Sequence, residues 1–264
     1  MHQPIAEKHS FLGRAGLFLC AAILLVPTFV AAQTRPLFNL QSTTQSPFPS
    51  DRFTVRDAGQ NTGIRVALPL PNCATHPSDC ADLSLLNQLD GFNPQPRLSI
   101  PFDGDIDPKS VSSKTVFLVQ LPARFKMGRE FDDDDWHGFH ANIIGINQVV
   151  WDPASLTLFA ESDEHLDQHA HYLLVVTRGV HDAAGPPIHR ARGLDDDDDD
   201  HGDKRLRIYR HALHRVLDND VLRRLAHGLD RDDIAAASLF TVESVTSTLE
   251  SIRNQVKAAA APSV

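Results

Sequence analysis

Two catalytic signatures are absent from this chain of 264 residues. No Gly-x-Ser-x-Gly pentapeptide occurs, so the sequence offers no serine on the strained strand-to-helix turn of the lipase and esterase fold. No His-Glu-x-x-His occurs either, which removes a common zinc-protease signature. The apolar segments also lack the strand–helix alternation that builds a parallel sheet. These absences predict a protein that is not an enzyme and holds no cofactor.

The chain has no excess of positive charge. Its formal net charge is -9, with 25 Lys and Arg against 34 Asp and Glu. A nucleic-acid partner needs a basic face, and adsorption to anionic lipid needs clustered cations. The net charge therefore argues against both kinds of partner.

The longest apolar run is too short for a membrane anchor. It extends over residues 15–30 and contains Pro27, whereas a spanning helix needs about 20 apolar residues. Lys8 and Arg14 precede the run, and Ala31 and Ala32 follow it. This pattern predicts a signal peptide over residues 1–32, no stable membrane span after its removal, and a periplasmic, cell-surface or extracellular protein.

Cysteine is scarce. Of three cysteines, Cys20 lies within the predicted signal peptide, which leaves Cys73 and Cys80. An even number of cysteines in an oxidising compartment favours a disulfide, and the spacing does not suit a four-ligand zinc site. We expect a disulfide between Cys73 and Cys80.

What the sequence does contain is a series of short apolar segments separated by turns. These segments are rich in β-branched and aromatic residues, and Gly, Pro or Asp lies between them, as in an antiparallel β-sandwich. The predicted strands are Leu98–Phe102, Thr115–Val119, Leu156–Ala160, His171–Thr177 and Ala235–Thr241, with Val66–Leu70 as an edge strand.

Three helices are predicted from apolar spacing. The first is Asp82–Leu89 with Asp82 as its cap, the second runs from about Arg205 to His227, and the third carries Val245, Leu249, Ile252 and Val256. The predicted organisation is therefore a lead segment with a disulfide loop (33–92), a sandwich (93–241) with a helical insertion (about 204–228), and a C-terminal helix and linker (242–264).

Several stretches of the sequence resemble a known family. The run Pro96–Val111 (P-x-L-S-I-P-F-D-G-x-I-D-P-K-S-V) and the stretch Tyr172–Gly185 resemble the bacterial Ig-like domain of the S-layer type. The same run, with Leu89–Phe92 (L-D-G-F) and Phe48–Thr54, more closely resembles the N-terminal domain of bacterial virulence-factor lipases. The resemblance covers about Phe48 to Val256.

The resemblance implies an Ig-like antiparallel β-sandwich without catalytic residues, because catalysis in that family belongs to a separate hydrolase domain. The implied role is structural or binding, at the cell envelope, with a hydrolase domain or an envelope component as partner. An alternative is a truncated or split part of a secreted lipase or esterase whose hydrolase domain is missing from this chain. A further alternative is a calcium-stabilised envelope protein.

The calcium alternative depends on two acidic runs, at residues 132–135 and 195–200. Both fit the start of an EF-hand, but the twelfth position is Ile144 or Ile208, where a bidentate Glu is required. The runs are then either solvated loops or loose Ca²⁺ sites. The ligands would be Asp133, Asp135, Asp197 and Asp199.

A histidine cluster, His165, His169 and His171, has spacing that could hold zinc on a helix. The resemblance instead places these residues in a turn that leads into a strand. We therefore expect solvated histidines rather than a metal site.

Overall fold

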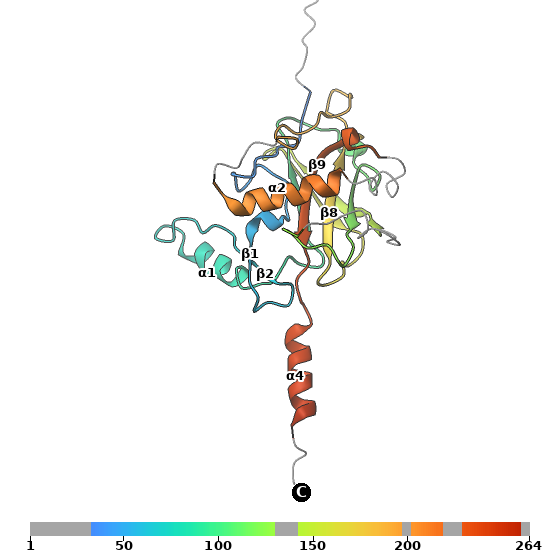
Figure 1. Ribbon diagram of the computed structural model, residues 1–264. Helices are drawn as coiled ribbons and strands as arrows, with labels where there is room; N and C mark the ends of the chain where they lie inside the picture. The colour runs from blue at the N-terminus through green and yellow to red at the C-terminus, as the bar shows by residue number, and fades with distance from the viewer. Residues whose placement is uncertain (1–32, 130–141, 197–201, 219–228, 260–264) are drawn as a thin grey trace, which may run out of the picture. The chain divides into compact units, whose positions relative to one another are not determined.

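The computed structural model describes residues 33–129, 142–196, 202–218 and 229–259, and Gln33–Val264 falls in one compact unit (Figure 1). The described chain is mainly β, with three antiparallel sheets. The smallest sheet pairs β1 (Thr54–Arg56) with β2 (Ile64–Val66).

Two larger sheets form the sandwich. The first has the strand order β3 (Arg97–Pro101), β7 (Thr157–Ser162), β6 (Ile146–Asp152). The second has the order β5 (Ile143–Ile144), β4 (Val116–Gln120), β8 (His171–Thr177), β9 (Ile234–Thr241). These strands confirm the predicted mainly β sandwich, and β8 has the predicted bounds.

The helices in the described ranges are α1 (Pro77–Leu86), α2 (Lys204–Leu217) and α4 (Ser247–Ala258). Short 3-10 turns occur at η1 (Asp51–Phe53), η2 (Pro108–Ser110) and η4 (Arg231–Asp233). Asp203 caps α2, because its side chain accepts a hydrogen bond from the Arg205 backbone N–H.

The core is shared by the two large sheets. In β3 and β7 buried and partly exposed residues alternate, and Leu98 lies opposite Ala160 in the register. In β4 and β8 almost every residue is buried, so both faces of that sheet are covered. This difference in burial explains the difference in sequence pattern. Residue character alternates along β3 and β7, whereas apolar residues run continuously along β4 and β8.

The outer edge of β9 is covered by other parts of the chain. The Leu239 N–H donates to the Tyr209 hydroxyl of α2 at 3.1 Å, and the Thr241 N–H donates to the Asp51 carboxylate of η1 at 3.0 Å. The Ala235 carbonyl accepts from the Ala191 N–H at 2.8 Å. Figure 1 shows α2 lying across this part of the sheet. An edge strand with satisfied backbone groups cannot pair with another chain.

The lead segment lies along the sandwich. Phe48 pairs with Ser99 and Pro36 with Phe102, both on the side of β3 that β7 leaves free. The buried apolar side chains of the segment belong to the shared core, and they include Phe38, Leu40, Phe53 and Phe92.

Some predicted boundaries were wrong. Helix α1 begins at Pro77 rather than Asp82, because Pro77 suits the first helical position. Strand β2 ends at Val66 because the Asn87 side chain, and not a neighbouring strand, bonds both the N–H and the C=O of Leu68. Helix α2 ends at Leu217, and the predicted helical residues 219–228 lie outside the described ranges.

Candidate functional site

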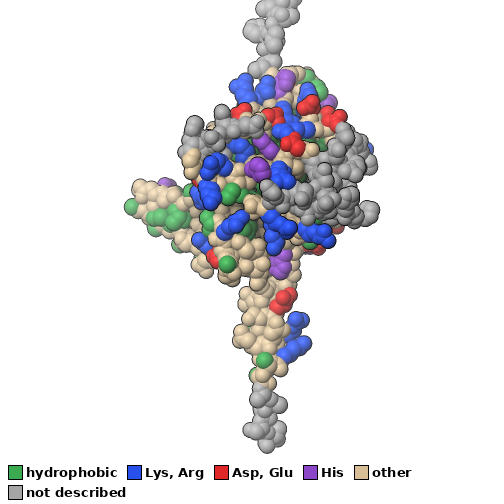
Figure 2. Space-filling view, in the orientation of Figure 1, with side chains coloured by type: hydrophobic (Ala, Val, Ile, Leu, Met, Phe, Trp, Pro, Cys, Tyr) green, Lys and Arg blue, Asp and Glu red, His purple; other side chains and the backbone are tan. Residues whose placement is uncertain are grey.

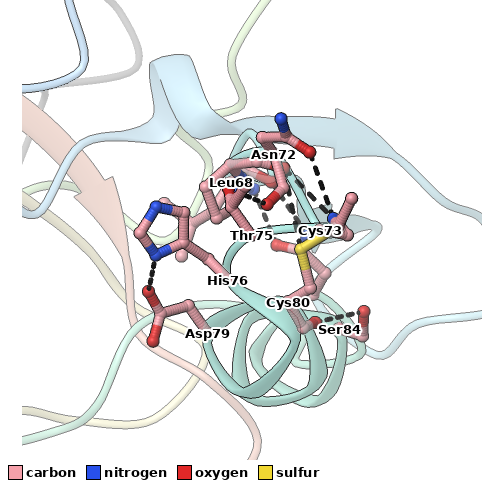
Figure 3. The surroundings of a disulfide bond; sticks show 11 residues. Leu68, Asn72, Cys73, Thr75, His76, Asp79, Cys80 and Ser84 are labelled. Atoms are coloured by element: carbon pink, nitrogen blue, oxygen red, sulfur yellow. Dashed lines mark hydrogen bonds and ion pairs between the residues drawn. A yellow bond between two sulfur atoms is a disulfide. The ribbon is translucent and has the colours of Figure 1, made fainter.

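The predicted disulfide is present. Cys73 and Cys80 are bonded, with their Cα atoms 5.6 Å apart (Figure 3). Around them the Asn72 carboxamide accepts from the Ala74 N–H at 3.1 Å, and the Ser84 hydroxyl donates to the Cys80 carbonyl at 2.6 Å. Cys80 is the buried residue of α1, whereas Leu85 and Leu86 are exposed. The disulfide therefore links α1, which contributes little to the core, to the loop that precedes it.

A buried carboxylate joins the lead segment to β9. Asp51 accepts hydrogen bonds from the Thr241 N–H at 3.0 Å and from the Thr241 hydroxyl at 2.6 Å. Burial raises the pKa of Asp51 to about 7, an effect that the two hydrogen bonds partly oppose. The neighbouring Arg52 donates to the carbonyls of Leu40 and Ser42, and its guanidinium stacks on Phe53 at 3.9 Å. Residues 51–53 are therefore bonded both to residues 40–42 and to Thr241 at the end of β9.

His171 contacts the same threonine from the other side. Its Nδ1 lies 2.8 Å from the Thr241 hydroxyl, and its ring packs edge-on against Phe125. Burial, with a smaller effect of the Lys126 charge, lowers the pKa of His171 to about 4. The expectation of a solvated histidine was wrong for His171, which is partly buried at the start of β8, whereas His165 and His169 are exposed as expected.

The acid, hydroxyl and imidazole do not form a hydrolytic triad. In a Ser-His-Asp triad the imidazole lies between the carboxylate and the nucleophile. Here the Thr241 hydroxyl lies in the middle and donates to Asp51, and Thr241 is completely buried. The arrangement holds strands together and offers no hydroxyl to a substrate.

The Asp51 hydrogen bonds form one clamp on β9, and the Asp90 carboxylate forms a second clamp just after that strand. The Asp90 carboxylate accepts from the backbone N–H of Ser244 at 2.8 Å and from its hydroxyl. Phe92 donates its N–H to the Thr241 carbonyl at 2.8 Å. A Cβ on Gly91 would lie 2.7 Å from the Glu243 nitrogen, so only glycine permits this backbone approach. The Leu89–Phe92 motif therefore fixes the chain where it leaves the sandwich.

Helix α4 begins at this clamp. The Thr246 N–H donates to the Gln168 carboxamide at 3.2 Å, and the Thr246 hydroxyl donates to Glu250 at 2.7 Å. Beyond this anchored base no residue of α4 is buried.

The apolar residues of α4 form one exposed stripe. Leu249, Ile252 and Val256 recur at spacings of three and four residues, which places them on one side of the helix. Their side chains, and that of Val245 in the turn before the helix, are between 51% and 69% exposed.

The proposed calcium ligands cannot be placed, because Asp133, Asp135, Asp197 and Asp199 lie outside the described residues. Within the described ranges, no group of three or more His, Cys, Asp and Glu side chains is positioned to hold a metal ion. Across the same ranges, no helix combines the length and apolarity needed to cross a bilayer.

Sequence reasoning missed the clamps formed by Asp51 and Asp90. The available signal was an aspartate next to aromatic and apolar residues, in Ser-Asp-Arg-Phe and Leu-Asp-Gly-Phe. An acidic residue in such a setting needs a hydrogen-bond partner when it is buried.

Comparisons with known proteins do not assign the chain. No protein-family model matches it, and no curated protein matches its sequence.

Proposed function

We propose that this chain is an exported, non-catalytic Ig-like module with a structural or binding role at the cell envelope. The strand order supports the Ig-like assignment. An Ig sandwich places strands A, B, E and D in one sheet and C, F and G in the other. Here β3, β7 and β6 correspond to B, E and D, and β5, β4, β8 and β9 correspond to C′, C, F and G. The lead segment beside β3 takes the position of strand A.

A tyrosine near the start of β8 supports the same assignment. The Tyr172 hydroxyl accepts a hydrogen bond from the Asp167 backbone N–H at 2.9 Å. Ig sandwiches carry a tyrosine at this corner, early in strand F, that bonds the backbone a few residues upstream. Tyr172 meets that description in sequence position and in geometry.

The disulfide supports export. A bond between Cys73 and Cys80 persists in an oxidising compartment, which agrees with the signal peptide predicted for residues 1–32. The buried polar groups support the non-catalytic assignment, because their hydrogen bonds are used within the fold. Asp51 and His171 bond Thr241 at the end of β9, and Asp90 bonds Ser244 just after it.

The observation that carries the binding role is helix α4. Two motifs of the lead segment fix the end of β9, and the helix that follows exposes its whole apolar stripe. Isolated helices of about this length are marginal in water, so an exposed helix gains stability from an apolar partner. The partner is a hydrolase domain or an envelope component with a complementary apolar helix or groove.

The test compares the stripe with residues of α4 that lie outside it. We expect Leu249→Ser with Ile252→Ser to leave the melting temperature within about 2 °C of the native value, as the matched control Asn254→Ser with Gln255→Ser does. A photoreactive residue at position 249 should form a discrete adduct in the producing cells, and one at position 254 should not. Melting lowered by the stripe variant alone, or equal adducts from both positions, would contradict the binding role.

A further inference from the structure

Cationic side chains from three separate segments gather on one surface, although the chain as a whole is acidic. They come from β1, from the loop after β4 and from the first turn of α2, and all six are exposed. We name this set the basic surface: Arg56, Arg124, Lys126, Arg129, Lys204 and Arg207. Figure 2 shows Lys and Arg side chains gathered on the face that α2 crosses.

The three segments meet at Gly128. The Arg56 guanidinium donates to the Met127 carbonyl at 3.3 Å, which joins β1 to the loop. Gly128 also lies against that guanidinium and against the Ile208 side chain of α2. Lys204 is one helical turn before Ile208, and Arg207 precedes it directly. These contacts bring β1, the loop after β4 and the first turn of α2 together.

No carboxylate among the described residues forms an ion pair with these six cations. The ion pairs of the described ranges involve other cations, such as Arg190 and Arg231 with Asp195, and Arg205 with Asp203. The described carboxylates that adjoin these cations in the sequence, Asp57 and Asp203, pair instead with Arg65 and Arg205. Like charges gathered on a surface attract an anion.

The centre of the basic surface is apolar. Met127 and Ile208 are partly buried and lie among the cations. An apolar centre ringed by Lys and Arg suits a bilayer interface, where cations meet phosphates and apolar groups meet the acyl boundary. Guanidinium groups such as Arg56 and Arg207 bind phosphate oxygens in pairs.

We propose that the basic surface binds a lipid membrane through its phosphate headgroups. The inference deepens the proposed envelope role and rests on that role only for the presence of a membrane nearby. The net charge of -9 argued against adsorption to anionic lipid. A net charge is a sum over the whole chain, however, and does not show where the cations gather.

The experiment measures sedimentation of the exported, purified protein with vesicles of phosphatidylglycerol or of phosphatidylcholine. The test variant is Lys126→Gln, Arg129→Gln and Lys204→Gln. The matched control, Lys109→Gln, Lys114→Gln and Lys257→Gln, removes three exposed Lys charges elsewhere. Removing one cation near an anionic surface costs about fivefold in partitioning, so the test variant should bind phosphatidylglycerol at least about tenfold more weakly. The native and control proteins should bind it equally, and none should bind phosphatidylcholine.

Three results would overturn the proposal. They are no binding to phosphatidylglycerol, equal weakening in both triple variants, and binding of soluble polyphosphate as tight as binding of the vesicles. The last would mean that the surface takes phosphate anions from solution rather than a membrane. None of these results affects the adduct test on α4, so the two proposals can fail separately.

Discussion

Asp51 and His171 both contact Thr241, and their pKa shifts change the free energy of unfolding with pH in opposite directions. Asp51 has its pKa raised to about 7, so its contribution to the free energy of unfolding is full below pH 3.8 and is lost as pH rises through about 7. His171 has its pKa lowered to about 4, so its contribution is present above pH 6.5 and is lost as pH falls towards 4. The two effects offset each other between about pH 4 and 6.5.

Single substitutions should separate these effects. Relative to the native protein, Asp51→Asn should gain stability as pH rises from 4 to 7, and His171→Gln should lose it, each by roughly 1 kcal/mol per pH unit. Denaturant unfolding at several pH values measures this. Parallel pH profiles for all three proteins would show that neither group titrates as described.

Gly91 is the residue with the closest backbone neighbours in the Leu89–Phe92 clamp. Gly91→Ala would place a Cβ within 2.8 Å of backbone atoms of residues 241–243, which cannot move without breaking the end of β9. We expect a loss of about 2–3 kcal/mol in the free energy of unfolding. Gly59→Ala is the control, because its Cβ meets one side-chain oxygen, that of Asp57 at 3.2 Å, and no backbone atom within 4 Å. Equal losses in the two variants would contradict the close approach.

The sequence could not reveal these clamps because their partners are distant along the chain. Thr241 is 190 residues from Asp51, and Ser244 is 154 residues from Asp90. A local pattern reports whether a residue lies on an apolar face, but not which distant backbone group it bonds.

At the scale of elements, the additions to the sandwich protect its strand edges. Helix α2 and η1 cover β9, and the lead segment covers β3. Strand β6 carries a register shift between Asn147 and Val150 that disrupts pairing, and Gln148 there has a positive φ of 46°. Helix α2, η1 and the lead segment therefore keep the β9 and β3 edges from pairing with other chains.

Helix α1 depends on the disulfide more than the sandwich does. Closing a loop of this length stabilises by about 2.5 kcal/mol in the chain-entropy estimate, and α1 has little core contact of its own. Reduction, or Cys73→Ala with Cys80→Ala, should therefore unfold α1 locally. Hydrogen exchange should quicken at residues 77–86 while that of β8 stays unchanged. Equal acceleration in both elements would mean that the disulfide supports the whole fold.

The strands were easier to predict than the helices. Alternation and continuous apolar runs located β3, β4, β7, β8 and β9 to within one or two residues. The start of α1 was missed because the decisive signals, Pro77 and the bonded Cys80, lie before the Leu repeat that suggested the helix. Of the four residues that marked the predicted C-terminal helix, Leu249, Ile252 and Val256 lie in α4, and Val245 lies in the turn before it. Their exposure was not predicted, since apolar spacing alone suggests burial.

For the whole molecule, the acidic runs make the effect of calcium on stability a test of the calcium-stabilised alternative. The twelfth position of each EF-hand alignment is occupied by a residue of the fold, Ile144 in β5 and Ile208 in α2, so neither can supply a bidentate carboxylate. We expect 5 mM Ca²⁺ to change the melting temperature by less than about 1 °C. A rise of several degrees, reversed by a chelator, would instead support the calcium-stabilised alternative.

The fold class of the molecule was visible in its sequence, because a sandwich is a repetition of one local pattern. Its function was not, because the groups that could carry chemistry, such as Asp51 and His171, are used inside the structure to hold β9. Two exposed features of the described residues suit binding, the α4 stripe and the basic surface.

The most direct test of a non-catalytic module is an esterase assay on the purified, exported chain with short-chain and long-chain acyl esters. The expected result is hydrolysis no faster than in buffer alone, because the hydroxyl beside Asp51 and His171 is buried and bonded. Turnover that a single serine substitution abolishes would contradict it.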